Sequence, residues 1–365
     1  MALSASDLLL VAGQWRPLAR EPLNSADVER MAEGILTPPR RERLQAARDL
    51  DLALAVYGVG RFRLNVHYQR GSIAVAVRVI PAAAPTFESL NLPEQVLDFT
   101  RYPSGLVLVT GPTGSGKSTT LAALIEEMNR SRSSHVVTIE DPIEFSFSHG
   151  SCIIEQRQIG DDSPSFASAL KHILRQRPDV ILIGEMRDLE TISAALTAAE
   201  TGHLVLASLH TAGADLSLSR IIDVFPPAQQ PHVRTQVAAS LMAILSQVLV
   251  RDQSDGGLIP ATEILVATGA IRRAIRENET HLIPGMMETG KRYGMHTLEQ
   301  NLVELVRSGR IRADDAIAAA GDSTRLRRLI GVGAGHDETV EAVEWRADET
   351  AMSREVRTAD PTWGQ

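Results

Sequence analysis

The sequence predicts an α/β protein whose central domain is a parallel sheet, preceded by a small α+β unit and followed by helices. Three patterns in the 365 residues support this prediction. Strands with period-two alternation occupy much of the first eighty residues, apolar runs then alternate with helical segments, and helical periodicity follows. We therefore expect an N-terminal domain over residues 1–80, a linker with a leading helix over 81–101, a core over 102–260, a helical region over 261–331 and a tail over 332–365.

The first eighty residues indicate two helices and a meander of strands. Ser25 and Thr37 are the expected N-caps, and Pro38 follows in the first turn of the second helix. In residues 61–69, apolar side chains such as Leu64 and Val66 alternate with polar ones, as in a strand with one buried face. The expected strands cover residues 7–11, 50–57, 61–69 and 73–80, and the Pro-Ala-Ala-Ala-Pro stretch at 81–85 is the expected linker.

The middle of the chain has the pattern of a parallel sheet covered by helices on both faces. Short apolar runs fit strands that are buried on both sides, and helical segments separate them. The expected strands are 106–110, 136–139, 180–183 and 204–207, and the expected helices are 118–130, 165–175, 189–200 and 216–223. After about residue 260 the pattern is purely helical, with helices expected at 270–277, 296–308 and 313–320.

Composition and charge exclude several classes of protein. The single cysteine, Cys152, rules out an intramolecular disulfide framework and a four-cysteine zinc module. The longest apolar run, 237–250, contains polar residues and is too short to span a bilayer. Five of the eight net negative charges fall in residues 336–365, which we expect to be disordered, so the body of the protein is nearly neutral. Because the body is nearly neutral and aromatic residues reach only 4%, we expect no nucleic-acid partner. From the single cysteine and the lack of a spanning run we expect a cytoplasmic location.

A glycine-rich loop follows the first apolar run of the core. It fits the pattern of a glycine, four residues, and Gly-Lys-Ser, and it opens a helix with periodic apolar residues. In such a loop backbone N–H groups surround phosphate oxygens, the lysine reaches the β- and γ-phosphates, and the serine hydroxyl binds Mg²⁺. The alternative is a glycine-rich turn before an ordinary helix, but the strand–loop–helix context favours ATP and Mg²⁺. The expected binding residues are Gly111, Pro112, Thr113, Gly114, Ser115, Gly116, Lys117, Ser118 and Thr119.

Two acidic residues follow later strands, where ligand-facing loops of a parallel sheet collect. Glu144 closes the acidic segment 138–144, and Glu185 ends an apolar strand, with Gly184 where an aspartate is common. Hydrolysis of ATP needs one carboxylate that orients water and an acidic group that holds the metal's water shell. We take both residues as candidates, against the alternative of solvated strand ends. Glu140 and Asp141 are weaker candidates, because Asp-Pro also forms turns.

Two histidines flank the apolar run 204–207. His203 begins this strand and His210 follows it, and we expect both at the same edge of the sheet as the phosphate loop. A histidine near a γ-phosphate responds to it by hydrogen bonding, whereas elsewhere it caps a helix or is a satisfied core group. The residues alone leave these two interpretations equal.

Four ordered segments resemble the Walker A, Asp, Walker B and His boxes of the type II/IV secretion ATPases. The segments are residues 111–119, 138–145, 174–188 and 201–211, and the match extends over about residues 6–331. Residues 270–277 are similar to the C-terminal signature of the retraction ATPases of twitching motility within that superfamily. The resemblance implies a RecA-like P-loop NTPase core, a PAS-like N-terminal domain and a small helical C-terminal region. It also implies a hexameric ring at the cytoplasmic base of a pilus.

The resemblance also implies roles for individual residues. Glu144 corresponds to the catalytic acid that polarises water, and Glu185 to the Walker B acid that acts with Ser118 on Mg²⁺. His203 and His210 would contact the surroundings of the γ-phosphate or couple it to an interface. On the meander strands, Arg63 and Arg78 stand where the family places arginines that reach nucleotide across a domain or subunit interface, although strand arginines are otherwise solvated.

The function expected from these features is an Mg²⁺-dependent ATPase ring that disassembles a type IV pilus. Its partner would be an inner-membrane platform protein, through which alone it meets the membrane at the inner face. Helix 270–277 would carry this coupling, with Ile271 and Ile275 packed inward and Arg272, Arg273 and Arg276 facing outward. The nearest alternative is a secretion or pilus-extension ATPase of the same superfamily. A nucleic-acid translocase and a non-hydrolysing scaffold are further alternatives.

Overall fold

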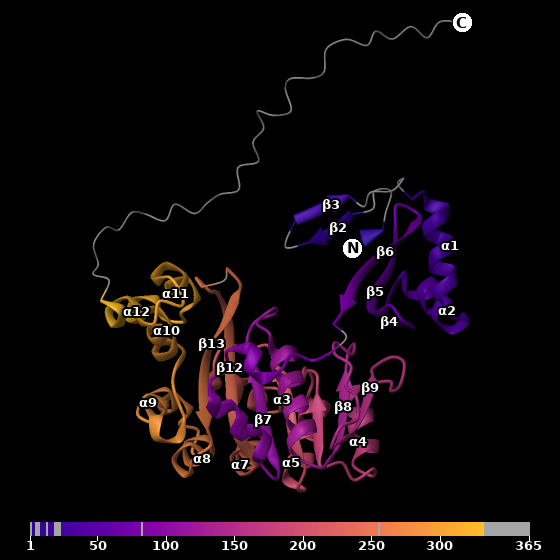
Figure 1. Cartoon of the computed structure of the whole chain (residues 1–365). Helices are drawn as coiled ribbons and strands as arrows, with labels where there is room; N and C mark the ends of the chain where they lie inside the picture. Colours follow the sequence, from indigo (N-terminus) through magenta and orange to yellow (C-terminus); the bar gives the residue numbers. More distant parts are fainter. Residues whose placement is uncertain are drawn as a thin grey trace, which may run out of the picture.

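The computed structural model describes residues 2–3, 8–11, 14–17, 23–81, 83–254 and 256–331, with side chains from residue 23 onward. Two sheets, each with its own helices, make up these residues (Figure 1). The expectation of a disordered tail concerns residues 332–365, which lie outside the described residues. Within the described residues, no helix is both long and apolar enough to cross a membrane.

The N-terminal sheet has the strand order β3-β2-β1-β6-β5-β4. Its strands β4, β5 and β6 pair as consecutive antiparallel neighbours, which confirms the predicted meander. The bounds of the six strands are Ala2–Leu3 (β1), Leu8–Val11 (β2), Gln14–Pro17 (β3), Asp49–Val56 (β4), Gly60–Gln69 (β5) and Ser72–Ile80 (β6).

Two helices, α1 (Ser25–Ile35) and α2 (Pro38–Ala47), cover one face of this sheet and form a small core with it. Helix α2 begins as predicted, with Thr37 at its N-cap and proline in its first turn. Helix α1 begins one residue earlier than predicted, because Asn24 and not Ser25 is its N-cap. The Asn24 side chain accepts from the backbone N–H of Asp27, whose carboxylate accepts from the N–H of Asn24. This reciprocal capping box satisfies two backbone donors at the helix start.

The core sheet has the strand order β13-β12-β7-β11-β10-β8-β9, and its strands are parallel except for β13. The apolar runs of the sequence form β7, β8, β10 and β11, so the predicted RecA-like α/β fold is confirmed. The bounds are Gly105–Thr110 (β7), His135–Glu140 (β8), Ile153–Gln158 (β9), Val180–Ile183 (β10), Leu204–Leu209 (β11), Leu241–Arg251 (β12) and Leu258–Val266 (β13).

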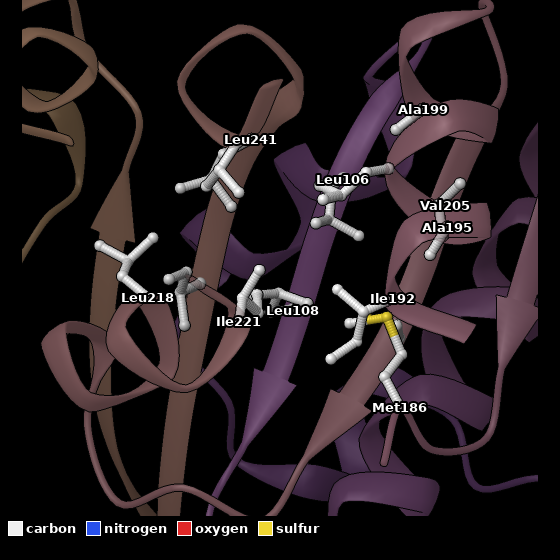
Figure 2. Packing of buried hydrophobic residues seen from close by; sticks show 14 of the residues in the cluster. Leu106, Leu108, Met186, Ile192, Ala195, Ala199, Val205, Leu218, Ile221 and Leu241 are labelled. Carbon is white, nitrogen blue, oxygen red and sulfur yellow. The ribbon is translucent and has the colours of Figure 1, made fainter. Parts of the chain in front are cut away.

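Hydrophobic side chains fill the space on both faces of the core sheet. On one face, Leu106 and Leu108 of β7 pack with Ile192 of α5 and Ile221 of α6 (Figure 2). On the other face, alternate residues of the same strands pack against α3 and the leading helix η2. The helices here are α3 (Lys117–Ser131), α4 (Phe166–Ile173), α5 (Leu189–Glu200), α6 (Ala214–Asp223), α7 (Gln230–Ser240) and α8 (Gly269–Arg276), with short 3₁₀ turns η1 (Phe87–Leu90) and η2 (Glu94–Arg101).

The last three C-terminal helices pack on β12 and β13 around a smaller apolar cluster that includes Leu302 and Leu326, whereas the first adds Ile283 and Met287 to the main core. These helices are α9 (Ile283–Glu288), α10 (Leu298–Arg307), α11 (Ala313–Ala319) and α12 (Ser323–Ile330), with 3₁₀ turns η3 (Thr280–Leu282) and η4 (Lys291–Tyr293). The prediction that the chain is purely helical after about residue 260 is wrong, because β13 continues to Val266. Proline at position 260 fits this strand because β13 is the edge of the sheet, where a missing backbone donor is tolerated.

Helix α8 also differs from the prediction at one position. Its isoleucines are buried as expected, but Arg272 does not face outward. The Arg272 guanidinium donates to the carbonyl oxygens of Ala238 (2.5 Å) and Ala239 (2.7 Å) at the end of α7, and its Nε donates to Ala267 (2.9 Å). Arginine there satisfies carbonyls that the end of a helix leaves without partners. Arg272 therefore connects α8 to the end of α7, and its guanidinium is not available to contact a partner protein.

Candidate nucleotide-binding site

The phosphate loop joins the carboxyl end of β7 to the start of α3, as the sequence predicts. Gly111, Gly114 and Gly116 all have positive φ angles, of 145°, 81° and 88°, a region that side chains disfavour. A Cβ atom at position 111 would lie 2.2 Å from the carbonyl oxygen of Gln247. This glycine therefore also allows β7 and β12 to approach closely at the loop.

Lys117 folds back over the loop. Its Nζ donates to the carbonyl oxygens of Gly111 (3.0 Å) and Pro112 (2.9 Å), and the side chain is largely buried. Burial lowers the pKa of the Lys117 ammonium, while the carboxylates of Glu185 and Glu144 act in the opposite direction. A buried ammonium whose nearest partners are uncharged carbonyl oxygens can exchange them for the oxygens of an anion, which bind it more strongly.

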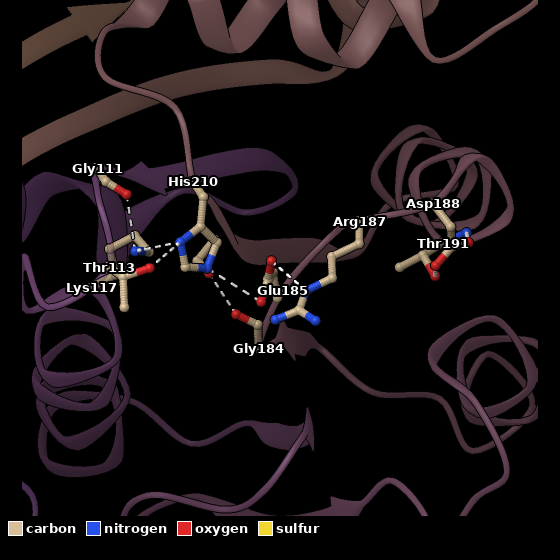
Figure 3. A network of polar contacts seen from close by, with 10 residues as sticks. Gly111, Thr113, Lys117, Gly184, Glu185, Arg187, Asp188, Thr191 and His210 are labelled. Atoms are coloured by element: carbon tan, nitrogen blue, oxygen red, sulfur yellow. Dashed lines mark hydrogen bonds and ion pairs between the residues drawn. The ribbon is translucent and has the colours of Figure 1, made fainter.

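A chain of polar contacts connects the phosphate loop to the end of β10 (Figure 3). The Nδ1 atom of His210 lies 3.2 Å from Thr113 Oγ1 and 3.5 Å from Lys117 Nζ. The other ring nitrogen, Nε2, lies 3.3 Å from Glu185 Oε2, and Glu185 Oε1 accepts from Arg187 Nε at 2.6 Å. A hydrogen on Nε2 satisfies this arrangement, with Nδ1 as acceptor. His210 thus connects the loop that would hold phosphates with the carboxylate of Glu185, the predicted Walker B acid.

Glu185 remains ionised in this setting. Burial would raise its pKa, but the hydrogen bond and charge of Arg187, together with His210, outweigh burial and hold the pKa below its ordinary value. The residue before it, Gly184, packs against the neighbouring strand β8, where an added Cβ would lie 3.2 Å from the carbonyl oxygen of Ile139. A side chain at position 184 would therefore require a small shift of β8.

Glu140 holds the backbone of Glu144. Its buried carboxyl accepts hydrogen bonds from Thr138 Oγ1 (2.6 Å) and Gln156 Nε2 (3.2 Å), and lies 3.4 Å from the backbone nitrogen of Glu144. Burial raises the pKa of Glu140, and the negative charge of Glu144 adds to this effect. The sequence ranked Glu140 as a weak catalytic candidate. Its surroundings instead suit a residue that fixes the segment bearing Glu144.

Gln247 of β12 clamps the phosphate loop, and sequence reasoning missed it. Its Nε2 donates to the carbonyl oxygen of Ser115 (2.6 Å), and its Oε1 accepts from Thr120 Oγ1 (2.9 Å) in the first turn of α3. The side chain is 1% exposed, so both bonds are shielded from water. The sequence did carry one sign of this role, because Gln247 is a polar residue within the long apolar run 237–250.

The structure places the two histidines at opposite ends of strand β11. His210 follows the carboxyl end of β11, whereas His203 precedes its first residue, beside the amino end of β7. The carbonyl oxygen of His203 accepts from Gly105, and its ring Nδ1 lies 3.0 Å from the carbonyl oxygen of Ala198 at the end of α5. The expectation that both histidines lie beside the phosphate loop is therefore wrong for His203. Its ring caps a helix, which is the ordinary role of such a residue.

Arg63 and Arg78 lie directly opposite each other on β5 and β6. Arg78 is exposed, and Arg63 Nε lies 4.0 Å from the Asp51 carboxylate. Their neighbours Leu64 and Val77 point to the face covered by helices, so the arginines occupy the uncovered face. In the described part of the chain, no hydrogen bond or ion pair joins either arginine to the phosphate loop. A contact with a nucleotide in another subunit remains a prediction.

The loop and its surroundings fit a nucleotide. Among the described residues, the buried hydroxyls of Ser115 and Thr110 lack hydrogen-bond partners, and Ser115 belongs to the loop itself. An unpartnered buried donor in a ring of backbone N–H groups suits phosphate oxygens. Ser118 lies in the first turn of α3, as a hydroxyl that binds Mg²⁺ requires, and Glu185 follows a strand at the same edge.

Comparison with known proteins identifies the family. Residues 72–258 match the model of the type II/IV secretion system protein family. This chain belongs to that family. It is 41% identical over 319 residues to the "Twitching motility protein" of Neisseria gonorrhoeae, covering 87% of this chain and 85% of the relative. It is also 41% identical over 309 residues to the "Type IV pilus retractation ATPase PilT" of Pseudomonas aeruginosa, covering 85% of this chain and 90% of that protein.

A solved structure agrees with the assignment. The "Crystal Structure of the Pilus Retraction Motor PilT and Bound ADP" superposes with a TM-score of 0.84 at 42% identity, covering 90% of this chain and 94% of that chain. The family and fold expected from the four sequence boxes are therefore confirmed, and so is the similarity to twitching-motility proteins expected from residues 270–277.

Proposed function

We propose that this family member is an Mg²⁺-dependent ATPase that powers retraction of a type IV pilus. The observation that carries the proposal is the chain of contacts from Lys117 through His210 to Glu185, which joins a phosphate loop to a Walker B carboxylate at one edge of the sheet. The relatives named as retraction and twitching-motility proteins support the mechanical role.

Each residue of the site has a role in this proposal. Lys117 would leave the carbonyls of its own loop and bind the β- and γ-phosphates, while Ser118 and Glu185 would hold Mg²⁺, which neutralises phosphate charge when bound. Glu144 would orient the attacking water as general base, and Glu140 would hold the backbone nitrogen of Glu144 in place. His210 would sense the γ-phosphate, because it contacts both Lys117 and Glu185.

The mechanical role requires assembly. We propose a homo-oligomer, a ring of six subunits, in which Arg63 and Arg78 reach a nucleotide across an interface. The ring would act at the cytoplasmic side of the inner membrane on a platform protein of the pilus. The exposed Arg273 and Arg276 of α8, without Arg272, are the groups of that helix that could face this partner.

A deletion of the gene tests the direction of force. Loss of a retraction motor should leave more pili on the cell surface, and loss of an extension motor should leave none. A strain that carries the Lys117→Ala variant should match the deletion strain, since the site cannot bind phosphates. A deletion strain without surface pili would favour the alternative of an extension or secretion ATPase. Stimulation of turnover by DNA or RNA would instead support a translocase.

A further inference from the structure

Three arginines of the N-terminal unit donate to the core, and all three reach the chain that follows β8. Arg61 Nη1 donates to Ser146 Oγ (2.9 Å), Arg40 Nη2 to Asp161 Oδ2 (2.9 Å), and Arg43 Nη1 to the carbonyl oxygen of Gly160 (3.1 Å). Ser146 directly follows the Asp box, residues 138–145, which carries Glu144, and Gly160 and Asp161 follow β9. In Figure 1 the N-terminal sheet accordingly sits above β8 and β9.

The contact of Arg40 continues into the core through a buried side chain. Asp161 Oδ2 also accepts from Gln158 Nε2 at 2.8 Å, and Gln158 is 6% exposed. At its other end, Gln158 Oε1 faces the backbone nitrogen of Ile143 at 3.4 Å. Ile143 directly precedes Glu144 in the chain. An unbroken series of polar contacts thus runs from α2 to the backbone beside the carboxylate.

This series adds a second support to the backbone at Glu144, besides that of Glu140. The backbone nitrogen of Glu144 faces Glu140, and that of Ile143 faces Gln158, so two consecutive amides are directed by core side chains. Of these two supports, only Gln158 is connected to the N-terminal unit. Without Arg40 the Asp161 carboxylate loses its cation and can move, and Gln158 moves with it to keep the Nε2 hydrogen bond, because a buried amide without a partner is costly.

We propose that Arg40 is a positioning residue for hydrolysis. Arg40 holds Asp161, which holds Gln158, and Gln158 positions the backbone of the Asp box. The rate of hydrolysis therefore depends on the contact between the N-terminal unit and the core. The inference rests on the proposed role of Glu144. It differs from a role in nucleotide binding, because the series touches neither the phosphate loop nor Lys117. Loss of the Arg40 contact therefore lowers kcat and leaves KM for ATP unchanged.

The test measures ATP hydrolysis by the full chain with Mg²⁺, for Arg40→Ala and for the control Arg41→Ala. Arg41 neighbours Arg40 on α2 and is exposed. We expect Arg40→Ala to lower kcat about threefold to tenfold with KM changed less than twofold, Arg41→Ala to match the wild type, and Arg40→Lys to recover at least half of the loss. In a double-mutant cycle, Asp161→Ala should add no further loss to Arg40→Ala.

A second measurement separates this inference from the role of Glu144. Hydrogen exchange of the peptide that spans residues 141–147, recorded without nucleotide, should be faster in Arg40→Ala than in Arg41→Ala. The positioning role is refuted if exchange is unchanged, if the two arginine variants have equal kcat, or if the effects of Arg40→Ala and Asp161→Ala add. If exchange is faster while Glu144→Gln retains full turnover, the contact series stands and the catalytic assignment of Glu144 is wrong.

Discussion

Gln247→Leu is the substitution that most directly tests how the fold supports the phosphate loop. Leucine is close to glutamine in volume, so packing between β12 and α3 is kept while both hydrogen bonds are removed. The carbonyl oxygen of Ser115 then lacks the donor at 2.6 Å, and Thr120 Oγ1 lacks its acceptor at 2.9 Å. Both groups lie in or next to the loop that would enclose the phosphates.

The expected magnitude follows from burial. A buried polar group left without a partner costs about 1–3 kcal/mol. The Thr120 hydroxyl can rotate toward the carbonyl oxygen of Gly116, which already accepts from its backbone N–H, so its loss is recovered in part. The Ser115 carbonyl can recover only if the loop changes shape. We therefore expect the cost of one group, about 1–3 kcal/mol, which weakens ATP binding by roughly 5- to 150-fold.

Equilibrium titration with a fluorescent ATP analogue and calorimetry with ATP measure this change. The control is Gln229→Leu, an exposed glutamine before α7, which should bind ATP as the wild type does. Circular dichroism and thermal unfolding establish that both variants fold. The claim that Gln247 supports the phosphate loop is refuted if folded Gln247→Leu binds ATP with an affinity within twofold of the wild type.

Three further predictions concern other parts of the structure. Glu144→Gln should lower kcat by about 100-fold or more with ATP affinity unchanged, and equal turnover would contradict its role as base. Arg272→Ala should lower the free energy of unfolding by about 1–2 kcal/mol, because three carbonyls lose a charged donor, whereas exposed Arg273→Ala should lower it by less than about 0.5 kcal/mol in denaturant titration. The hydrogen bond from Arg310 holds the pKa of Asp252 well below its ordinary value, so this carboxylate stabilises the fold above the unfolded pKa of about 4 and ceases to do so as pH falls further. The unfolding temperature of Asp252→Asn should therefore be lower than that of the wild type at pH 7, and the difference should shrink only as pH falls below about 4 toward the much lower folded pKa; a difference that stays constant over that acid range would contradict the pairing.

Local sequence patterns predicted the part of the site that is contiguous in the chain. The apolar run before Gly111 and the periodic residues after Lys117 determine a strand, a loop and a helix by themselves, so this strand–loop–helix arrangement was predicted correctly. Glu185 was placed correctly for the same reason, because it follows a short apolar strand.

The residues that sequence patterns misplaced depend on distant parts of the chain. Gln247 interrupts an apolar run, which obscured β12, yet its partners lie more than 120 positions earlier. His203 and His210 flank one strand and so lie at its two ends, and the direction of β11 beside β7 shows that only His210 lies at the end that carries the phosphate loop. Arg272 fits the polar side of an amphipathic helix, but the end of α7 supplies carbonyls that draw it inward.

Phosphate release by the purified full-length protein tests the central claim most directly. With Mg²⁺ and ATP, the wild type should release phosphate continuously, and Lys117→Ala, folded by circular dichroism, should release none above background. A folded wild-type protein that neither binds ATP nor releases phosphate would contradict the assignment of the loop before Lys117 as a nucleotide site. The motor function built on that assignment would then be lost as well.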